Sequence, residues 1–206
     1  MEKQTMRNLT LLIILTLAFT VSLTAQGRRQ VGQIDDPNTP DRAHFQLSVI
    51  REYDSLKDLY TDSDLVVQGD VKSVLPTVDL SLSKSGHNLV TGVLFTITAT
   101  YRGTPLPQVV VVQSGGTIDK LERIPDQFHL MQQGEHYILF LVDDSRLQAA
   151  GAPHSPTYAV TGAWTGLFRD IKGVLQLSPA TNPALRARYD GRAPSVLLGD
   201  LAAIGR

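Results

Sequence analysis

No cysteine occurs among the 206 residues, and this absence excludes several classes of protein. A chain without thiols forms no disulfide scaffold, thiolate zinc site or iron–sulfur cluster, and it has no cysteine nucleophile or lipid-modified cysteine. Charge is also scarce, since 19% of the residues are charged and 19 basic residues stand against 20 acidic ones. A nucleic-acid surface needs an excess of positive charge. We therefore expect no nucleic-acid partner.

Aromatic residues are few as well, at 6% of the chain, whereas the hydrophobic fraction of 42% is ordinary for a globular protein. Single-stranded nucleic acids bind to aromatic platforms in a basic groove. The aromatic residues of the expected barrel mostly alternate like core residues; they are Phe95, Tyr101, Tyr137, Phe140, Tyr158, Trp164 and Phe168. This pattern indicates a packed core and gives a second reason to expect no nucleic-acid partner.

The N-terminal segment carries the clearest targeting signal in the sequence. Lys3 and Arg7 precede an uncharged run of apolar and small residues from Leu9 to Ala25. A basic start, an apolar run and a small residue before the cleavage point are typical of a secretory signal peptide. We expect a signal peptide that is cleaved after Ala25, with cleavage after Gly27 as the alternative.

An uncleaved membrane anchor competes with this interpretation. The apolar run has 17 residues, at the short end of what crosses a hydrocarbon core about 30 Å thick. Arg28 and Arg29 follow the run directly, and positive charge on the far side opposes export. Five hydroxyl residues weaken the run as a permanent span. We expect a secreted or periplasmic protein, held at the membrane only if its N-terminus stays uncleaved.

Four segments follow from the composition along the chain. They are the signal peptide or anchor (1–25), a flexible linker (26–44), a β-barrel domain (45–180), and a polar stretch with a C-terminal helix (181–206). The linker is polar and rich in turn residues, without a hydrophobic period of either kind. One folded domain is the natural number at this length.

Alternating apolar and polar residues predict several strands. Two long strands are expected at 64–74 and 93–101, and Gly69 in the first indicates a bulge or a strong bend. Shorter strands are expected near residue 45 and at 108–113, 134–142, 157–160, 166–169 and 173–177. Such an inventory of mostly short strands is typical of a small barrel.

Helices have a minor place in the pattern. A short helix is expected near 56–60, capped by Asp54 or Ser55, and a second at 195–204, capped by Ser195. Two long connections, 114–133 and 149–156, are expected to be functional or partly structured. The fold class predicted from these elements is mainly β, a small Greek-key (OB-like) barrel with one or two short helices and a C-terminal helix.

Four motifs in order along the chain carry a family resemblance. They are SDLVVQGDV at 63–71, YRG at 101–103, QSGG at 113–116 and GEHYILFL at 134–141. This succession resembles a domain of uncharacterised secreted bacterial proteins, and it is similar to the OB-fold of netrin-like domains and of tissue inhibitors of metalloproteinases. The resemblance covers roughly residues 55–177 and implies a fold more than a function.

One functional element of that inhibitor family is missing from this chain. The resemblance implies that the reactive group would be an amino-terminal cysteine that grips the zinc of a protease, and this chain has no cysteine. Neither Gln26 nor Arg28 would replace such a cysteine. We therefore expect no inhibition of metalloproteases by that mechanism.

Candidate catalytic and metal-binding residues have plain structural explanations in the sequence. Glu135 and His136 are adjacent on a predicted strand, so they point to opposite faces and cannot serve one site. Asp62 and Asp64 lie at a turn and fall short of the six to eight oxygens that calcium takes. The five histidines show no metal-ligand spacing; they are His44, His87, His129, His136 and His154.

Two further sequence patterns could indicate a catalytic or metal-binding residue. The Ser114-Gly115-Gly116 sequence lacks the strand-to-helix elbow of a serine hydrolase, so a turn is expected there. Asp143 and Asp144 are expected to end a strand in water. We accordingly expect no catalytic residue, no cofactor and no metal site.

The expected function is that of an exported, non-catalytic β-barrel binding module whose partner is a protein or a cell-envelope glycan. Trp164, between two glycines, is the one residue that the sequence offers as a partner contact, because aromatic anchors dominate many interfaces. Burial of Trp164 in the core is the competing interpretation. The alternative function is that of a membrane-anchored structural or accessory protein of the envelope.

Overall fold

The computed structural model describes residues 41–45, 51–81, 87–144 and 155–205. The chain divides into two units, 1–36 and 37–206, and the first unit lies outside the described residues. The expected signal peptide and most of the expected linker therefore fall outside the description. None of the helices within the described ranges is both long and apolar enough to span a membrane.

Five strands close into a barrel, which confirms the predicted fold class. Hydrogen bonds join the strands in the order β7–β2–β3–β4–β8, and β8 pairs back with β7. All neighbours are antiparallel except β4 and β8, which are parallel. The strands are β2 (Leu65–Asp79), β3 (Leu89–Arg102), β4 (Gln108–Ser114), β7 (His136–Asp143) and β8 (Thr157–Val160). Since β7 returns beside β2, the order β7–β2–β3–β4 is a Greek key.

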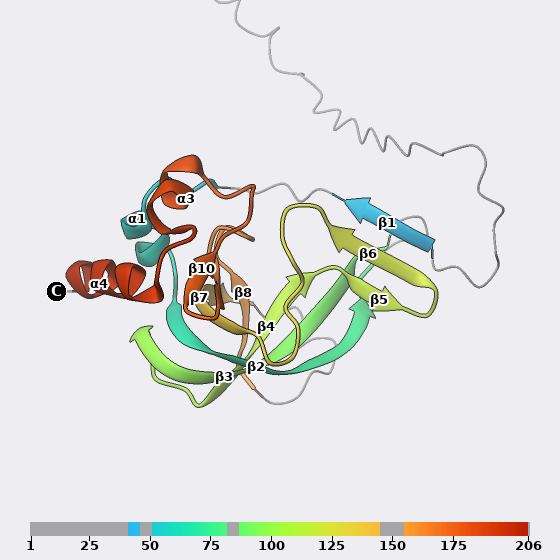
Figure 1. The fold of residues 1–206 in the computed structure, drawn as a ribbon. Helices are drawn as coiled ribbons and strands as arrows, with labels where there is room; N and C mark the ends of the chain where they lie inside the picture. Colours follow the sequence, from blue (N-terminus) through green and yellow to red (C-terminus); the bar gives the residue numbers. More distant parts are fainter. Residues whose placement is uncertain (1–40, 46–50, 82–86, 145–154, 206) are drawn as a thin grey trace, which may run out of the picture. The chain divides into compact units, whose positions relative to one another are not determined.

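Five further strands lie around the barrel (Figure 1). β9 (Leu167–Ile171) and β10 (Val174–Gln176) extend the sheet beyond β7. β1 (Asp41–Phe45), β5 (Gly116–Ile118) and β6 (Leu121–Pro125) form a separate sheet in the order β1–β6–β5. The connection 114–133 is therefore partly structured, as expected, and β1 begins before the expected domain boundary at residue 45.

The two faces of the barrel sheet bury two different cores. Tyr137, Leu139 and Leu141 of β7 point into the barrel, where they join Val67 of β2 and Phe95 of β3. Alternate residues point outward, because successive side chains in a strand face opposite sides. The outward core consists mainly of Val66, Ile138, Phe140, Phe168, Leu175, Leu185, Tyr189, Leu197 and Leu201.

Three helices cover this outward core within the described part of the chain. They are α1 (Leu56–Thr61), α3 (Pro183–Tyr189) and α4 (Pro194–Ile204), which gather at one side of the barrel in Figure 1. The prediction that Ser195 caps the last helix is wrong, because Ala193 is the N-cap residue and Pro194 occupies the first turn. Proline suits that position, since the first-turn amide has no partner within the helix.

The long strands bend where the sequence predicts a bulge. The pairing of β2 with β3 shifts register between Gln68 and Gly69 and at three other points. A Cβ atom on Gly69 would clash with the carbonyl oxygen of Thr96 and would lie 2.9 Å from the ring of Phe95. Glycine at this position therefore lets β3 approach β2 closely as both strands curl around the barrel.

Candidate functional site

A recess lies between the three helices at the helical side of the barrel. Its volume is about 390 Å³, and most of its lining is apolar. α1 contributes Leu56 and the residues before it, α3 one wall and α4 the other. The lining residues are Asp54, Ser55, Leu56, Ala184, Leu185, Arg188, Tyr189, Asp200, Ala203 and Ile204.

An ion pair between α3 and α4 forms the polar rim of this recess. Arg188 donates two hydrogen bonds to Asp200, from Nε at 2.8 Å and from Nη2 at 2.9 Å. Tyr189 donates a third, from its hydroxyl to Asp200 Oδ2 at 2.8 Å. The bond from Arg188, followed by that from Tyr189, lowers the pKa of Asp200. The pair is charge-assisted and bidentate, so it holds the two helices in a defined orientation.

Tyr189, which lines the recess, packs against two further aromatic rings. The Tyr189 ring meets Phe168 edge-on at 6.0 Å between centroids, and Phe168 lies 5.5 Å from Phe140. Burial, followed by the Asp200 hydrogen bond, raises the pKa of Tyr189 to about 12. The tyrosine is therefore neutral at physiological pH. It supplies a fixed wall, since its ring is 1% exposed.

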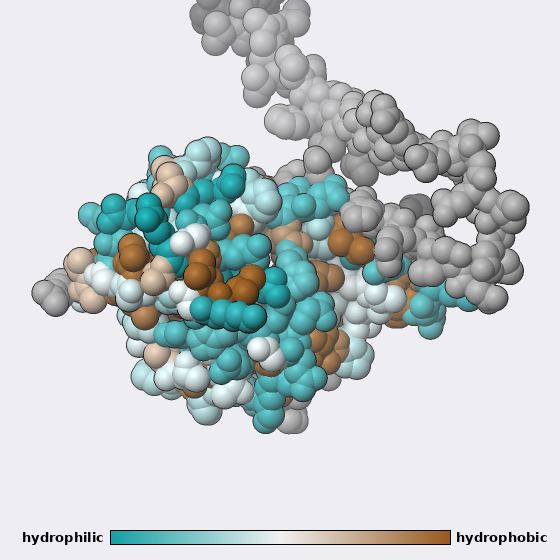
Figure 2. Space-filling view, in the orientation of Figure 1, coloured by the Kyte–Doolittle hydropathy of each residue, from teal (hydrophilic) through white to brown (hydrophobic). Residues whose placement is uncertain are grey.

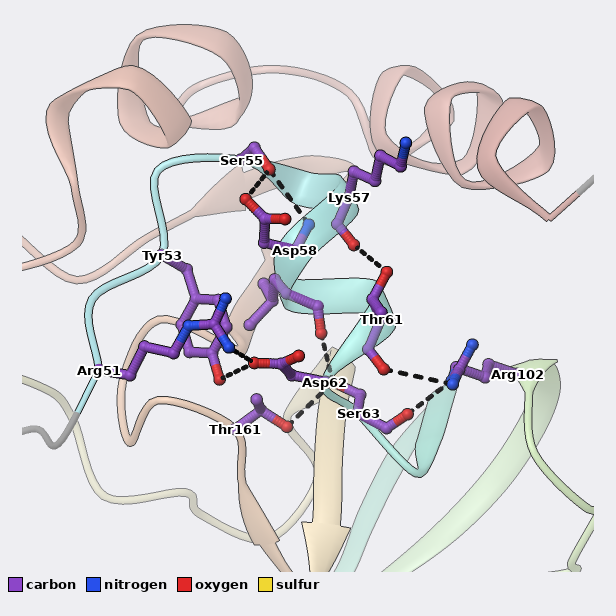
Figure 3. A network of polar contacts seen from close by, with 11 residues as sticks. Arg51, Tyr53, Ser55, Lys57, Asp58, Thr61, Asp62, Ser63, Arg102 and Thr161 are labelled. Atoms are coloured by element: carbon purple, nitrogen blue, oxygen red, sulfur yellow. Dashed lines mark hydrogen bonds and ion pairs between the residues drawn. The ribbon is translucent and has the colours of Figure 1, made fainter.

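The N-terminus of α1 is fixed by its cap, which Figure 3 shows in detail. The hydroxyl of Ser55 accepts a hydrogen bond from the Asp58 amide at 3.1 Å and donates one to the Asp58 carboxylate at 2.8 Å. This confirms Ser55 as the cap residue of the two that the sequence offers. The cap places Ser55 and Leu56 at the edge of the recess.

The C-terminus of α1 is tied to the barrel by a second group of contacts in Figure 3. Asp62 accepts hydrogen bonds from Arg51 and from the Tyr53 hydroxyl. Ser63, which is 1% exposed, shares a hydrogen bond of 2.9 Å with Thr161. Arg102 Nε donates to the carbonyl oxygen of Ser63 at 2.6 Å. These contacts make α1 a rigid wall.

Surface hydropathy points to the same side of the molecule. Figure 2 shows hydrophobic residues at the surface over α4 and over the β9–β10 turn, set among hydrophilic ones. The large hydrophobic residues exposed there are Val196 in α4, Ile171 in β9 and Val174 in β10, at 42%, 40% and 45% exposure. Exposed apolar residues thus occur on α4, which lines the recess, and on the β9–β10 hairpin.

Glu135 and His136 lie on opposite faces of the sheet, as the sequence predicts. The Glu135 carboxylate accepts hydrogen bonds from the Tyr137 hydroxyl at 2.6 Å and from Arg169, and it lies 3.0 Å from His129 Nε2. His136 instead contacts Asp70 and Gln68 of β2 on the outer face. The two residues therefore belong to separate polar groups.

The remaining sequence candidates take structural roles. Asp62 is the C-cap of α1, and Asp64 accepts a hydrogen bond from the Asp143 amide at 3.0 Å. Ser114 ends β4 at the turn into β5. Asp144 differs from expectation, because it is 9% exposed and its amide bonds to Thr157.

Metal ligands do not gather in the part of the chain that the structure describes. No group of three or more His, Cys, Asp or Glu side chains there could hold a metal ion. His154 and the loop segment 149–154 lie outside that part, and of His44 only the backbone, in β1, is described.

Trp164 lies in the turn between β8 and β9 and is 7% exposed. Its carbonyl oxygen accepts a hydrogen bond from the Leu167 amide, which helps to close the turn. The indole ring is therefore largely covered in the free protein, and a role for Trp164 in binding a partner stays a prediction.

The recess itself could not be located in the sequence, because α1 is distant along the chain from α3 and α4, which form its other walls. Asn182 before Pro183 is a cap-and-proline signal for α3, within the stretch 181–194 for which only polar character is predicted above. No protein-family model matches the chain, and no curated protein is significantly similar to it in sequence.

Proposed function

We propose that the protein is an exported, non-catalytic binding module, and that its partner is a protein that inserts an apolar side chain into the recess between α1, α3 and α4. The observation that carries this proposal is the recess itself, an apolar hollow of about 390 Å³ whose rim is an ion pair. Pockets of this kind accept anchor side chains at protein interfaces, where one or two buried groups supply most of the binding energy.

Rigid walls support a role in recognition. A binding site with fixed walls loses little conformational entropy when the partner arrives. The Ser55 cap, the Arg188–Asp200 pair and the buried Tyr189 ring fix α1, α4 and α3 respectively. The site is thus preorganised for a partner of complementary shape.

A protein suits the lining better than a glycan does. Sugar hydroxyls need hydrogen-bond partners, and burying them against apolar atoms leaves them unsatisfied. Most of the lining is apolar, with Leu56, Leu185, Ala184, Ala203 and Ile204 among its residues. A leucine, isoleucine or phenylalanine side chain would bury apolar surface there at about 25 cal/mol per Å².

Two carboxylates in the described part are engaged in ways that suit a scaffold better than a catalyst. Glu135 is held by Tyr137 and Arg169, and Asp200 by Arg188 and Tyr189. A general acid or base needs a group free to reach substrate. These contacts support the non-catalytic part of the proposal.

We further propose that the chain is exported by its N-terminal segment, as the basic start and apolar run suggest. The resemblance to netrin-like and inhibitor OB-folds fits a secreted module, without the cysteine through which the inhibitors act. The alternative is an accessory protein of the envelope that remains anchored by residues 1–25, and the uncharged run followed by Arg28 and Arg29 favours it.

The experiment that tests the recess is affinity capture from envelope extracts with three forms of the protein. Ala184→Trp fills the recess from α3, whereas Ala187→Trp adds the same ring to the same helix outside the recess. Both alanines are exposed, so both variants should fold. We expect one protein to be captured by the wild type and by Ala187→Trp and to be lost with Ala184→Trp.

Two results would contradict the proposal. Equal capture by all three forms would place the partner elsewhere. Enrichment of a cell-wall glycan that Ala184→Trp does not reduce would favour a glycan site outside the recess. Trp164→Ala, compared in the same assay after a check of its folding, tests the sequence-based prediction of a contact there.

A further inference from the structure

A chain of four polar side chains crosses three strands on the outer face of the barrel. Asp70 and Gln68 lie on β2, His136 on β7 and Tyr101 on β3. His136 Nδ1 lies 2.8 Å from Asp70 Oδ1, and His136 Nε2 lies 3.0 Å from the amide nitrogen of Gln68. The Tyr101 hydroxyl donates to the amide oxygen of Gln68 at 2.7 Å. The chain is continuous from the Asp70 carboxylate to Tyr101.

These contacts fix where the proton of a neutral His136 resides. The Gln68 amide nitrogen can only donate, so His136 Nε2 must accept and carries no hydrogen. The ring proton is then on Nδ1, from which it is donated to Asp70. All hydrogen bonds among the four side chains are satisfied in this arrangement, in which the His136 ring is neutral.

A second arrangement satisfies the same groups when His136 is protonated. The imidazolium donates from both nitrogens, and an Nε2–H would face the NH₂ group of Gln68. Rotation of the Gln68 carboxamide by half a turn brings its oxygen to His136 and its nitrogen to the oxygen of Tyr101. One proton is added from solvent to Nε2, and no other covalent bond changes.

Charged groups around His136 can accommodate the imidazolium. Asp70 on β2 accepts from it directly, and Asp170 on β9 stands opposite it in the strand pairing, on the same face. Asp170 Oδ1 is held by the Gly173 amide at 2.7 Å. Glu135 and Arg169 belong to the opposite face, and Lys72 follows Asp70 at a register shift of β2.

We propose that the Asp70–His136–Gln68–Tyr101 chain is a proton-operated switch, in which protonation of His136 rotates the Gln68 amide and turns Tyr101 from hydrogen-bond donor to acceptor. Histidine changes charge between pH 5 and 8, the range that separates neutral from mildly acidic surroundings of an exported protein. His136 has 29% of its side chain exposed, so solvent protons reach it. The switch does not depend on the recess or on the proposed partner.

The Tyr101 end of the four linked side chains lies beside α1. The carbonyl oxygen of Tyr101 accepts a hydrogen bond of 3.1 Å from the Tyr60 hydroxyl of α1, and both rings pack against the outward core. A change in the hydrogen bonding of Tyr101 therefore occurs at the end of β3, next to α1.

Nuclear magnetic resonance of the full-length ¹⁵N-labelled protein tests the proposal. At pH 8 we expect the His136 nitrogens to report a protonated Nδ1 and an unprotonated Nε2. On acidification, the side-chain amide signals of Gln68 should move with the same midpoint as His136. The side-chain amide of Gln113, whose oxygen accepts a hydrogen bond of 2.8 Å from the Met131 backbone amide, serves as the control that stays in place.

Gln68→Glu gives the matched variant, because a carboxylate has no donor to turn: it accepts from Tyr101 in both states, and from His136 only when Nε2 is protonated. We expect the acid-dependent change at Tyr101 to disappear in this variant while His136 still titrates. A neutral His136 protonated on Nε2, or Gln68 amide signals that ignore the titration in the wild type, would overturn the proposal. The wild-type readouts decide the matter even if the variant fails to fold.

Discussion

Two glycines in this chain have opposite surroundings, and they show how a single residue sets stability here. Gly69 sits where β3 crosses β2 at contact distance, so any side chain must displace the Thr96 backbone or the Phe95 ring. Gly199 lies inside α4, and a Cβ atom there would meet nothing within 4 Å. The sequence predicts the importance of the first from its place inside a strand pattern.

Gly69→Ala should lower the free energy of unfolding by about 3 kcal/mol, at the upper end of the overpacking range, because the new methyl group meets backbone. Gly199→Ala should raise it by about 0.5–1 kcal/mol, since alanine restricts the unfolded chain and favours helix. Urea denaturation of both variants measures the two changes. A Gly69→Ala variant with an unchanged free energy of unfolding would contradict the close approach of β3 to β2.

The partly buried carboxylate of Glu135 makes the stability of the fold depend on pH on the acid side. Burial opposes its charged form, but the Tyr137 hydroxyl and the Gln132 amide, followed by the nearby basic groups, prevail and lower its pKa below the ordinary value of 4.5. Between the lowered and the ordinary value the unfolded chain binds more protons than the folded one. The stabilisation is therefore complete above about pH 4.5 and is lost as the pH falls through the lowered pKa.

Glu135→Gln should accordingly remove part of the rise in the free energy of unfolding with pH on the acid side. Glu52→Gln, at an exposed position, should leave that rise unchanged. Denaturation midpoints measured at a series of pH values below 6 distinguish the two. If the denaturation midpoints of wild type and Glu135→Gln depended on pH identically below pH 6, the Glu135 contacts would not stabilise the charged form.

At the scale of elements, the barrel strands could be predicted, and the small sheet and α3 could not. In β2 and β7, inward residues such as Val67 and Leu139 alternate with outward ones, and this alternation indicates a strand with one face in the barrel. β5 has three residues, Gly116–Ile118, too few for a period, and it exists because it pairs with β6. The recess could not be predicted either, because it depends on the tertiary packing of α1 against α3 and α4, which are distant from α1 along the chain.

The sequence offers a serine cap for both α1 and α4, and only the cap of α1 is confirmed. Ser55→Ala should cost about 1 kcal/mol of unfolding free energy, because Ser55 alone satisfies the first-turn amide of Asp58. Ser195→Ala should cost less than about 0.5 kcal/mol, since α4 starts at Pro194 without a side-chain cap. Equal losses in thermal or urea denaturation would contradict the observed start of α4.

At the scale of the whole molecule, the sheet ends in an edge that the chain itself covers. β10 is the outer strand, and its Leu175 exchanges backbone hydrogen bonds with Arg192 and Gly191, at 2.7 and 2.8 Å. The connection from α3 to α4 thus occupies the outward backbone groups of Leu175. Covered edges discourage strand-to-strand association, which favours side-chain recognition at the helices over strand addition at β10.

Export is also a property of the whole chain. If residues 1–25 act as a cleaved signal peptide, the protein recovered from the medium or the periplasm should begin at Gln26. Mass spectrometry of the intact protein from each cell fraction checks this. Full-length protein confined to the membrane fraction would support the anchored alternative.

The recess as the partner site is the central claim, and photo-crosslinking inside the producing cell tests it most directly. A photoreactive residue at position 203 lines the recess on α4, whereas the same residue at the neighbouring exposed position 202 lies outside the lining. The account predicts one dominant protein adduct from position 203 and little or none from position 202. Adducts of equal strength from both positions, or none from position 203, would contradict it.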